Sequence, residues 1–397
     1  MKRYEHFKKL KMNYIAAGIF SGVGCIVMVL FPEIALESAN RGISLWATSV
    51  LPALLPFFIC AGFMVSLGVP KIIGRYFEPL FRTVFRVPGN AAFVFLVSIT
   101  SGYPMGPKII SDLYRQKQIT KLDAKRMLSF CSTSGPLFLL GTVGVSMLHS
   151  AALGVSIAIS HYAGAILNGI IFCHIPTAKH ENSGLYSNKI YKKQIEEIGC
   201  TNLLVCFTEA ILSALRTLGI ICGYLVLFCL LTDFMQFCGL LQLFPSQIGK
   251  SLFRGFFEMT VGCNSISLAE GVSAVSKCAV ASFLISFGGL SIMAQSMSLL
   301  SGLGITPWTY LEMKLSHGIL SALIALLITP HCLKSAVVTG AFGVSLSDVN
   351  FSIAYGLLFS TKMVIMMILL ILILIVLNEW IIKKEKSHEG SRNHSRI

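Results

Sequence analysis

A short apolar run, residues 91–100 (AAFVFLVSIT), ends abruptly in the stretch SGYPMGPK. The run is long enough to enter a membrane, but a crossing helix needs about 20 residues. A break inside the bilayer exposes backbone N–H and C=O groups, and it is tolerated only where the backbone is buried in protein or lines a cavity. Two prolines and two glycines at this point therefore predict a re-entrant hairpin.

The composition places this break in a membrane protein. The 397 residues are 54% hydrophobic and only 13% charged, whereas soluble domains carry roughly 25% charged residues. The sequence therefore predicts an all-α polytopic membrane protein in contact with the lipid bilayer. Eight segments reach or approach the length of a crossing: Tyr14–Phe31, Ile43–Met64, a half-segment ending near Leu148, Ala151–His174, Leu218–Leu241, Cys278–Leu300, Thr309–Thr329 and Ser352–Asn378.

The basic residues predict which loops share a side. The net charge is +14, and 24 of the 32 Lys and Arg residues lie in two tails and three loops. The positive-inside rule accounts for this pattern better than nucleic-acid binding does. All five places lie on one side only if residues 91–110 enter and leave by the same face. We therefore expect eight crossings, cytoplasmic termini and no nucleic-acid partner. The loops 32–42 and 330–350 are expected on the opposite side.

An internal repeat relates two parts of the chain. SFCSTSGPL (129–137) matches SFLISFGGL (282–290) at an offset of 153 residues, and the same offset places Gly102 on Gly255. Each unit reads as a hairpin, a broken helix and a whole helix, with a second hairpin expected at 255–271. A single crossing between the units predicts an inverted repeat, an architecture of many secondary transporters. Residues 201–217 are expected to form an interfacial amphipathic helix.

These expectations divide the chain into five parts. They are the tail with two helices (1–90), the first repeat (91–174), a cytoplasmic loop with the interfacial and linking helices (175–253), the second repeat (254–330), and the last helix with a basic tail (331–397).

The breaks carry the candidate chemistry. Pro136 is expected at the start of a helix that ends near Leu148, and the free N–H groups of such a start would suit a carboxylate. Gly288 and Gly289 would form the equivalent site, although small residues at helix contacts are also explained by packing alone. The candidate substrate-binding residues are Ser101, Gly102, Tyr103, Pro104, Lys108, Ser132, Thr133, Ser134, Gly135, Pro136, Asn264, Ser286, Gly288 and Gly289.

Other features are assigned plainer roles. Lys314 is expected to reach the membrane surface or to form an ion pair, and His161 is a hydrogen-bonded core histidine rather than a proton relay. Glu258 is unexpected at an anion site and would suit a coupling cation or proton. Protease, P-loop and hydrolase motifs are absent from the sequence, so neither an enzyme nor a cofactor or metal site is expected. GIFSG (18–22) predicts a homo-oligomer contact.

The motifs SGYPMGPK (101–108), AxRMLSFCSTSGPLF (124–138, where x is Lys125) and GxVG (141–144) resemble the YlbJ (SpoVV) family of sporulation integral membrane proteins. The resemblance runs from Gly42 to about Asn378. It implies two Gate-like "nucleoside recognition" units and a fold similar to concentrative nucleoside transporters. It also implies transport of dipicolinate (pyridine-2,6-dicarboxylate) across the outer forespore membrane toward the forespore. A nucleoside carrier and a structural spore-maturation protein remain the alternatives.

Overall fold

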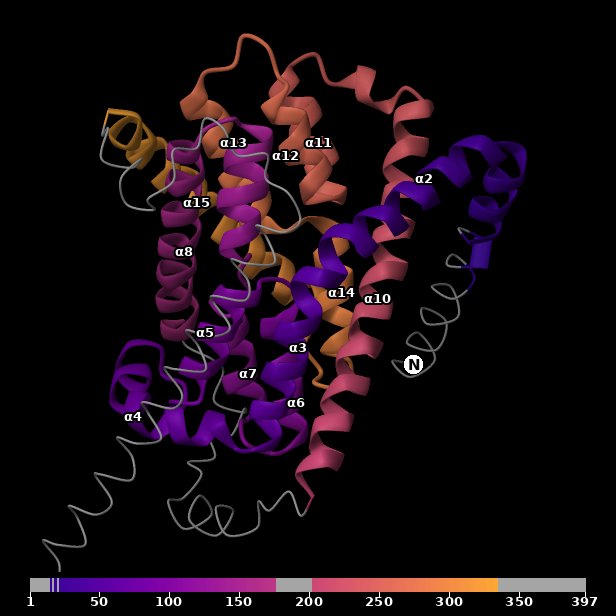
Figure 1. Ribbon diagram of the computed structural model, residues 1–397. Coiled ribbons are helices and arrows are strands. Elements are labelled where there is room, and N and C mark those ends of the chain that lie inside the picture. Colours follow the sequence, from indigo (N-terminus) through magenta and orange to yellow (C-terminus); the bar gives the residue numbers. More distant parts are fainter. Residues whose placement is uncertain (1–14, 16–17, 20, 176–201, 335–397) are drawn as a thin grey trace, which may run out of the picture.

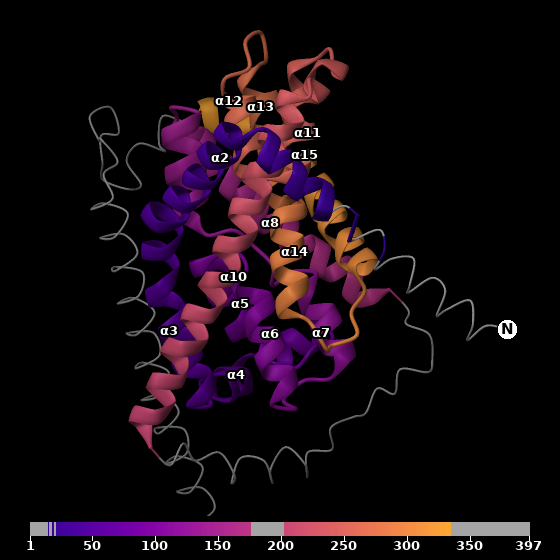
Figure 2. The same ribbon diagram turned by 90° about the vertical axis from the view of Figure 1, so that its right-hand side faces the viewer.

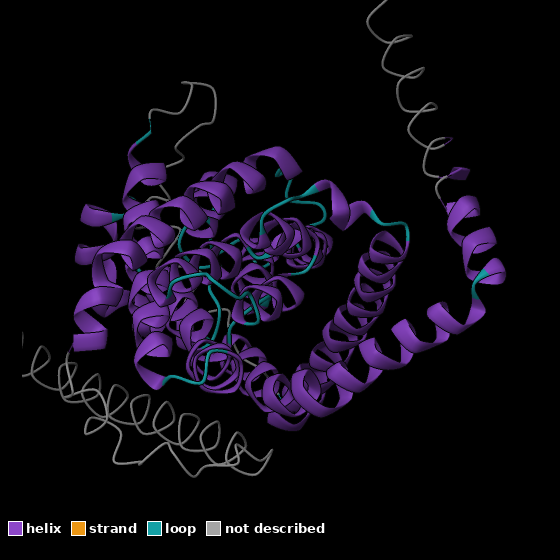
Figure 3. Ribbon diagram, turned by 90° about the horizontal axis from the view of Figure 1, so that it is seen from above, coloured by secondary structure: helices purple, strands orange, loops and turns teal. Residues whose placement is uncertain are grey.

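A computed structural model describes residues 15, 18–19, 21–175 and 202–334. Within these residues the secondary structure consists of helices and loops (Figure 3). The described part therefore agrees with the predicted all-α class.

Four helical segments are long and apolar enough to cross a membrane, or six if two bent pairs each count as one span. The four are Ala151–His174, Leu203–Phe237, Ala274–Leu299 and Pro307–Leu333; the bent pairs are Ser21–Leu30 with Pro32–Thr48 and Leu54–Ser66 with Val69–Val84. The predicted span 352–378 lies outside the described residues. The described part thus has room for four to six crossings by length and composition, against eight predicted for the whole chain.

The first unit begins with a helical hairpin. Its two arms, α5 (Ala91–Ser101) and α6 (Met105–Arg115), have 11 residues each, or about 16 Å, which is about half the hydrocarbon thickness. Next come α7 (Lys121–Leu128), an irregular segment, η2 (Leu137–Met147) and α8 (Ala151–His174). η2 starts one residue after the predicted Pro136, but it is wound as a π-helix.

The second unit has the same order of elements. The helices α11 (Gln247–Phe257) and α12 (Met259–Ser267) form a hairpin that turns at Glu258. They are followed by α13 (Ala274–Phe287), a break at Gly288, α14 (Gly289–Leu299) and the whole helix α15 (Pro307–Lys334).

The two hairpins lie at opposite ends of the molecule. α5 and α6 occupy the lower half and α11 and α12 the upper half in both Figure 1 and Figure 2. Arg126 of α7 donates from Nη1 to the carbonyl oxygen of Arg86 at 2.9 Å. The loops before and after the first hairpin therefore meet at one end, as the charge distribution predicts for a re-entrant segment.

Two predicted boundaries are wrong. The helix α10 (Leu203–Phe237) is continuous for 35 residues, so residues 203–217 do not form a separate interfacial helix; no proline interrupts them. The predicted loop 32–42 is helical, because Pro32 occupies the first turn of α2 (Pro32–Leu45), where proline is favoured.

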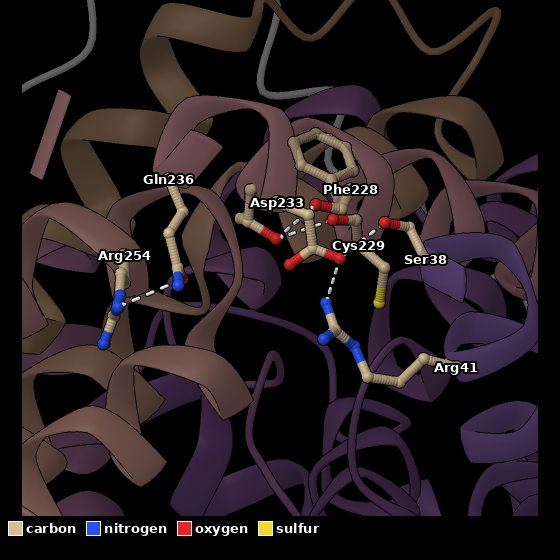
Figure 4. Close-up of polar contacts among 8 residues, drawn as sticks. Ser38, Arg41, Phe228, Cys229, Asp233, Gln236 and Arg254 are labelled. Atoms are coloured by element: carbon tan, nitrogen blue, oxygen red, sulfur yellow. Dashed lines mark hydrogen bonds and ion pairs between the residues drawn. The ribbon is translucent and has the colours of Figure 1, made fainter. Parts of the chain in front are cut away.

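The helix α2 continues through the π-helix η1 (Trp46–Val50) into α3 (Leu51–Ser66), and α4 (Val69–Val84) follows at a sharp bend. α2 and η1 are tied to α10: Trp46 Nε1 donates to the Leu218 carbonyl at 2.9 Å, and Asp233 accepts from Ser38 Oγ at 2.6 Å and pairs with Arg41 (Figure 4). A short 3-10 helix, η3 (Leu240–Leu243), then leads to α11.

Candidate functional site

The first junction is the place where the α5–α6 turn (101–104) meets the irregular segment 129–136. A Cβ added to Gly102, which has φ +82°, would lie 2.6 Å from the Gly135 nitrogen, and one on Gly106 would lie 1.6 Å from the Cys131 oxygen. Only glycine lets the two backbones approach this closely. The predicted neighbourhood of SGYPMG and the helix start at Pro136 is therefore present, and the Tyr103–Pro104 peptide bond within it is cis.

The first junction satisfies most of its own polar groups. Ser98 Oγ donates to the Cys131 carbonyl at 2.7 Å and accepts from the Thr133 nitrogen at 3.2 Å. The Ser134 nitrogen donates to His161 Nε2 at 2.9 Å. The backbone amides of Thr133 and Ser134, two of the predicted binding residues, thus already have protein partners.

The second junction is the place where the α11–α12 turn (257–259) meets the break at Gly288 and Gly289. A Cβ added to Gly289, which has φ +70°, would lie 2.9 Å from the Gly255 oxygen. Both junctions therefore depend on a hairpin and a broken helix that touch through glycine, as the sequence repeat suggests.

The two junctions come together in the interior. Tyr103 from the first hairpin, Met259 from the second, Ile292 of α14 and Phe138 of η2 form one apolar cluster. The Tyr103 hydroxyl also donates to the carbonyl of Ile285 in α13 at 3.1 Å. Tyr103 is thus a direct link between the first hairpin and the broken helix of the second unit.

Lys314 of α15 reaches this meeting point. It is only 3% exposed, and its ammonium lies 2.6 Å from Tyr103 Oη, 2.9 Å from the Ser132 carbonyl oxygen and 4.6 Å from the centre of the Tyr103 ring. It is paired with no carboxylate of the described residues. The prediction that Lys314 reaches the surface or forms an ion pair is therefore wrong within the described part: the lysine points into the core.

A second hydrogen-bonded link lies one helical turn away on α15. The Tyr310 hydroxyl donates to Ser296 Oγ of α14 at 3.0 Å and lies 2.8 Å from Ser132 Oγ. Tyr310, Ser132 and Ser296 are all buried. Ser132 therefore contacts Lys314 through its carbonyl and Tyr310 through its hydroxyl.

His161 of α8 connects the first junction to the second unit. Its Nε2 accepts from the Ser134 amide, so its Nδ1 carries the proton and donates to Ser286 Oγ at 2.7 Å. Ser286 then donates to Ser321 Oγ at 2.8 Å, and His317 Nε2 donates to the His161 carbonyl at 2.9 Å. His161 is the hydrogen-bonded core histidine that the sequence favoured.

Two predicted binding residues lie apart from this network. Lys108 forms an ion pair with Asp112 at 2.7 Å, one helical turn further along α6. Asn264 is exposed on α12. The other predicted residues belong to the two junctions or, in the case of Ser286, to the His161 link.

Glu258 closes the second junction rather than facing a cation there. It is 3% exposed, and its carboxylate accepts from the Val261 nitrogen at 2.8 Å as the N-cap of α12. A carboxylate at a helix start is favourable because of the free N–H groups and the helix dipole.

Sequence reasoning missed Tyr310 and His317 and misassigned Lys314. All three lie on α15 at spacings of three or four residues (310, 314, 317), which is the spacing of one helical face. This stripe of polar side chains in an apolar helix was the available signal.

The fold is thus that of an integral membrane protein whose helical hairpins and broken helices meet around a buried polar cluster. The Gate family model, described as nucleoside recognition, matches residues 47–151. These residues include the first junction but not residues 254–330, so a second Gate-like unit stays a prediction.

The chain is similar to the sporulation integral membrane protein YlbJ of Bacillus subtilis (strain 168). The two are 29% identical over 347 residues, covering 80% of this chain and 83% of YlbJ. The resemblance predicted from the motifs is confirmed. No solved structure matches the chain.

Proposed function

We propose that this chain is a secondary transporter that moves dipicolinate across the outer forespore membrane toward the forespore. The similarity to YlbJ supports a membrane role in sporulation. The Gate match and the absence of the enzyme motifs sought favour transport over catalysis. The choice of dipicolinate follows from the family resemblance. We also propose that the two units form an inverted repeat, as in many secondary transporters.

One observation carries the proposal: a buried lysine without a carboxylate partner among the described residues lies where the two junctions meet. A buried ammonium is costly unless an opposite charge accompanies it. An anionic substrate would supply that charge. Dipicolinate is a planar aromatic dianion, and Lys314 lies over the ring of Tyr103.

This arrangement changes the chemistry suggested by sequence. The helix start near Pro136 is less available than expected, because the Phe138 amide in its first turn donates to the Gly135 carbonyl at 3.1 Å and the Ser134 amide just before it donates to His161. Lys314 replaces it as the principal anion-binding group. The start of α14 at Gly289 is retained as a second contact.

A nucleoside carrier is the second candidate, since the matching family model is described as nucleoside recognition. A nucleoside is neutral and would bring no negative charge to Lys314, which has no carboxylate partner among the described residues. Competition binding of dipicolinate and uridine to the purified protein separates the two candidates. Displacement by uridine alone would favour the nucleoside carrier.

Uptake into proteoliposomes tests transport itself. Purified protein should take up dipicolinate. Uptake is measured with and without an imposed proton gradient, and the comparison distinguishes proton coupling from facilitation. Uptake should fall in Ser134→Leu and Gly288→Leu, which place bulk at the two junctions. A folded protein that takes up no dipicolinate in either condition would overturn the proposal and leave a structural role in spore maturation.

A further inference from the structure

An incompletely bonded amide lies on the buried face of α14. Gln295 is 2% exposed, its Nε2 lies 3.2 Å from Ser291 Oγ, and its Oε1 has no hydrogen-bond partner in the described part of the protein. Most buried polar side-chain atoms have a partner. The interior therefore holds an amide group with free hydrogen-bonding capacity.

The position of Gln295 connects it to the Lys314 cluster. α14 starts at the second junction, and Ile292, Gln295 and Ser296 are among its buried residues. Ile292 lies on the same face as Gln295, three residues earlier. Ile292 packs in the cluster with Tyr103, and Ser296 accepts from Tyr310. The residue one turn before Gln295 thus contacts Tyr103, which bonds to Lys314, and the residue directly after it bonds to Tyr310, which contacts Ser132 as Lys314 does.

Comparison with Asn168 shows what is unusual about Gln295. Both amides are buried and both have an unpaired oxygen, but Asn168 Nδ2 donates to the carbonyls of Ser129 at 2.7 Å and Met313 at 3.1 Å. Those two bonds fix the Asn168 amide. Gln295 has one long bond, and turning its amide over lets Ser291 donate to Oε1 and frees both Nε2–H groups.

We propose that Gln295 is a substrate-binding residue that donates a hydrogen bond to one carboxylate of a dicarboxylate, while Lys314 binds the other. This assignment rests on the proposed function. The Lys314 ammonium has three N–H groups and two partners among the described residues. One N–H therefore remains for a ligand. A site with one such donor from α14 and one from α15 selects an aromatic ring with two carboxylates over a ring with one.

The test compares two ligands on the purified protein: dipicolinate and picolinate (pyridine-2-carboxylate), which lacks the second carboxylate. Gln295→Met should weaken dipicolinate binding by about tenfold, because hydrogen bonds to charged groups are strong. It should change picolinate binding by no more than about twofold. Gln236→Met is the matched control, because Gln236 lies on α10 and accepts from Arg254 (Figure 4); it should alter neither affinity.

Gln295→Glu keeps the shape of the side chain and is measured in parallel. A carboxylate at this position repels the second carboxylate of dipicolinate, so it should weaken dipicolinate more than picolinate even if Gln295→Met does not fold. Equal weakening of both ligands, or no weakening of either, would overturn the role of Gln295. Failure of the wild-type protein to bind either ligand would instead overturn the proposed function.

Discussion

The first and second junctions share a backbone design but differ in what holds them closed. In the first junction, backbone lies against backbone: a Cβ on Gly106 would lie 1.6 Å from the Cys131 oxygen. In the second, the backbone approach is looser, because a Cβ on Gly289 would lie 2.9 Å from the Gly255 oxygen. A Cβ on Gly255 itself would first meet the Leu284 side chain at 2.4 Å, and a side chain can move. The polar chemistry also differs, because His161 and Lys314 bond to the first junction, whereas Glu258 caps a helix in the second.

This difference suggests that the first junction is rigid and that the second can rearrange. The first junction is braced by α8 and α15 through His161 and Lys314, and so has little freedom to rearrange. The second junction has a self-contained cap and a movable leucine. We expect changes in the first junction to affect folding most and changes in the second to be tolerated better.

Alanine at the two junction glycines should give the largest contrast. Gly106→Ala should prevent accumulation of folded protein, because overpacking costs about 1–3 kcal/mol, and more where backbone cannot move. Gly255→Ala should fold with a lowered unfolding temperature. Thermal unfolding in detergent measures both, with Gly223→Ala as control because no atom lies within 4 Å of its added Cβ. Equal tolerance of Gly106→Ala and Gly255→Ala would contradict this difference in rigidity between the junctions.

Loss of the His161 link should have the next largest effect. His161→Phe leaves the buried Ser134 amide without its acceptor, which costs about 1–3 kcal/mol. Tyr162→Phe removes a bond of 3.1 Å to the Ser134 carbonyl and should cost about 1 kcal/mol. Chemical unfolding of both variants provides the comparison. An unfolding free energy for His161→Phe equal to that of the wild type would show that the link is dispensable.

At the second junction, the charge of Glu258 should matter less than its ability to accept a hydrogen bond. Glu258→Ala should lower the unfolding free energy by about 1 kcal/mol through loss of the cap. Glu258→Gln, which keeps an acceptor, should lose about half as much and retain uptake. If Glu258→Gln abolishes the proton dependence of uptake while folding normally, Glu258 is a coupling residue rather than a cap.

The turn and the break that form the first junction could be predicted from the sequence, because their signals are local. Gly and Pro in SGYPMG predicted the first turn. The break at Ser132–Pro136 followed from Pro136. These signals depend on neighbours within a few residues.

The rest required tertiary contacts. A single lysine in an apolar helix looks the same in sequence whether it points to the core, as Lys314 does, or to the surface. The occupation of the Ser134 amide by His161 depends on how α8 packs. Residues 203–217 of α10 pack against α3, where Phe207 contacts Phe63 and Ala210 lies against Gly62. The exposure of Asn264 likewise depends on the face that α12 buries.

Outside both junctions, loss of the ion pair between Arg41 and Asp233 should have the smallest effect on the unfolding free energy. Arg41 is half exposed, and exposed ion pairs contribute about 0.2–1 kcal/mol. Arg41→Met should therefore change the unfolding free energy by no more than this and leave dipicolinate uptake intact. A large loss of uptake in this variant would place functional importance on the α2–α10 contact instead of on the junctions.

Dipicolinate uptake by Lys314→Met proteoliposomes, relative to wild type, tests the central claim most directly. The substitution removes the buried ammonium but keeps an apolar chain of similar length, so the substrate-free protein should unfold at the same or a higher temperature. Uptake should fall by at least about tenfold while the protein remains folded. Wild-type uptake by folded Lys314→Met would contradict the claim that the lysine at the meeting of the two junctions binds the substrate.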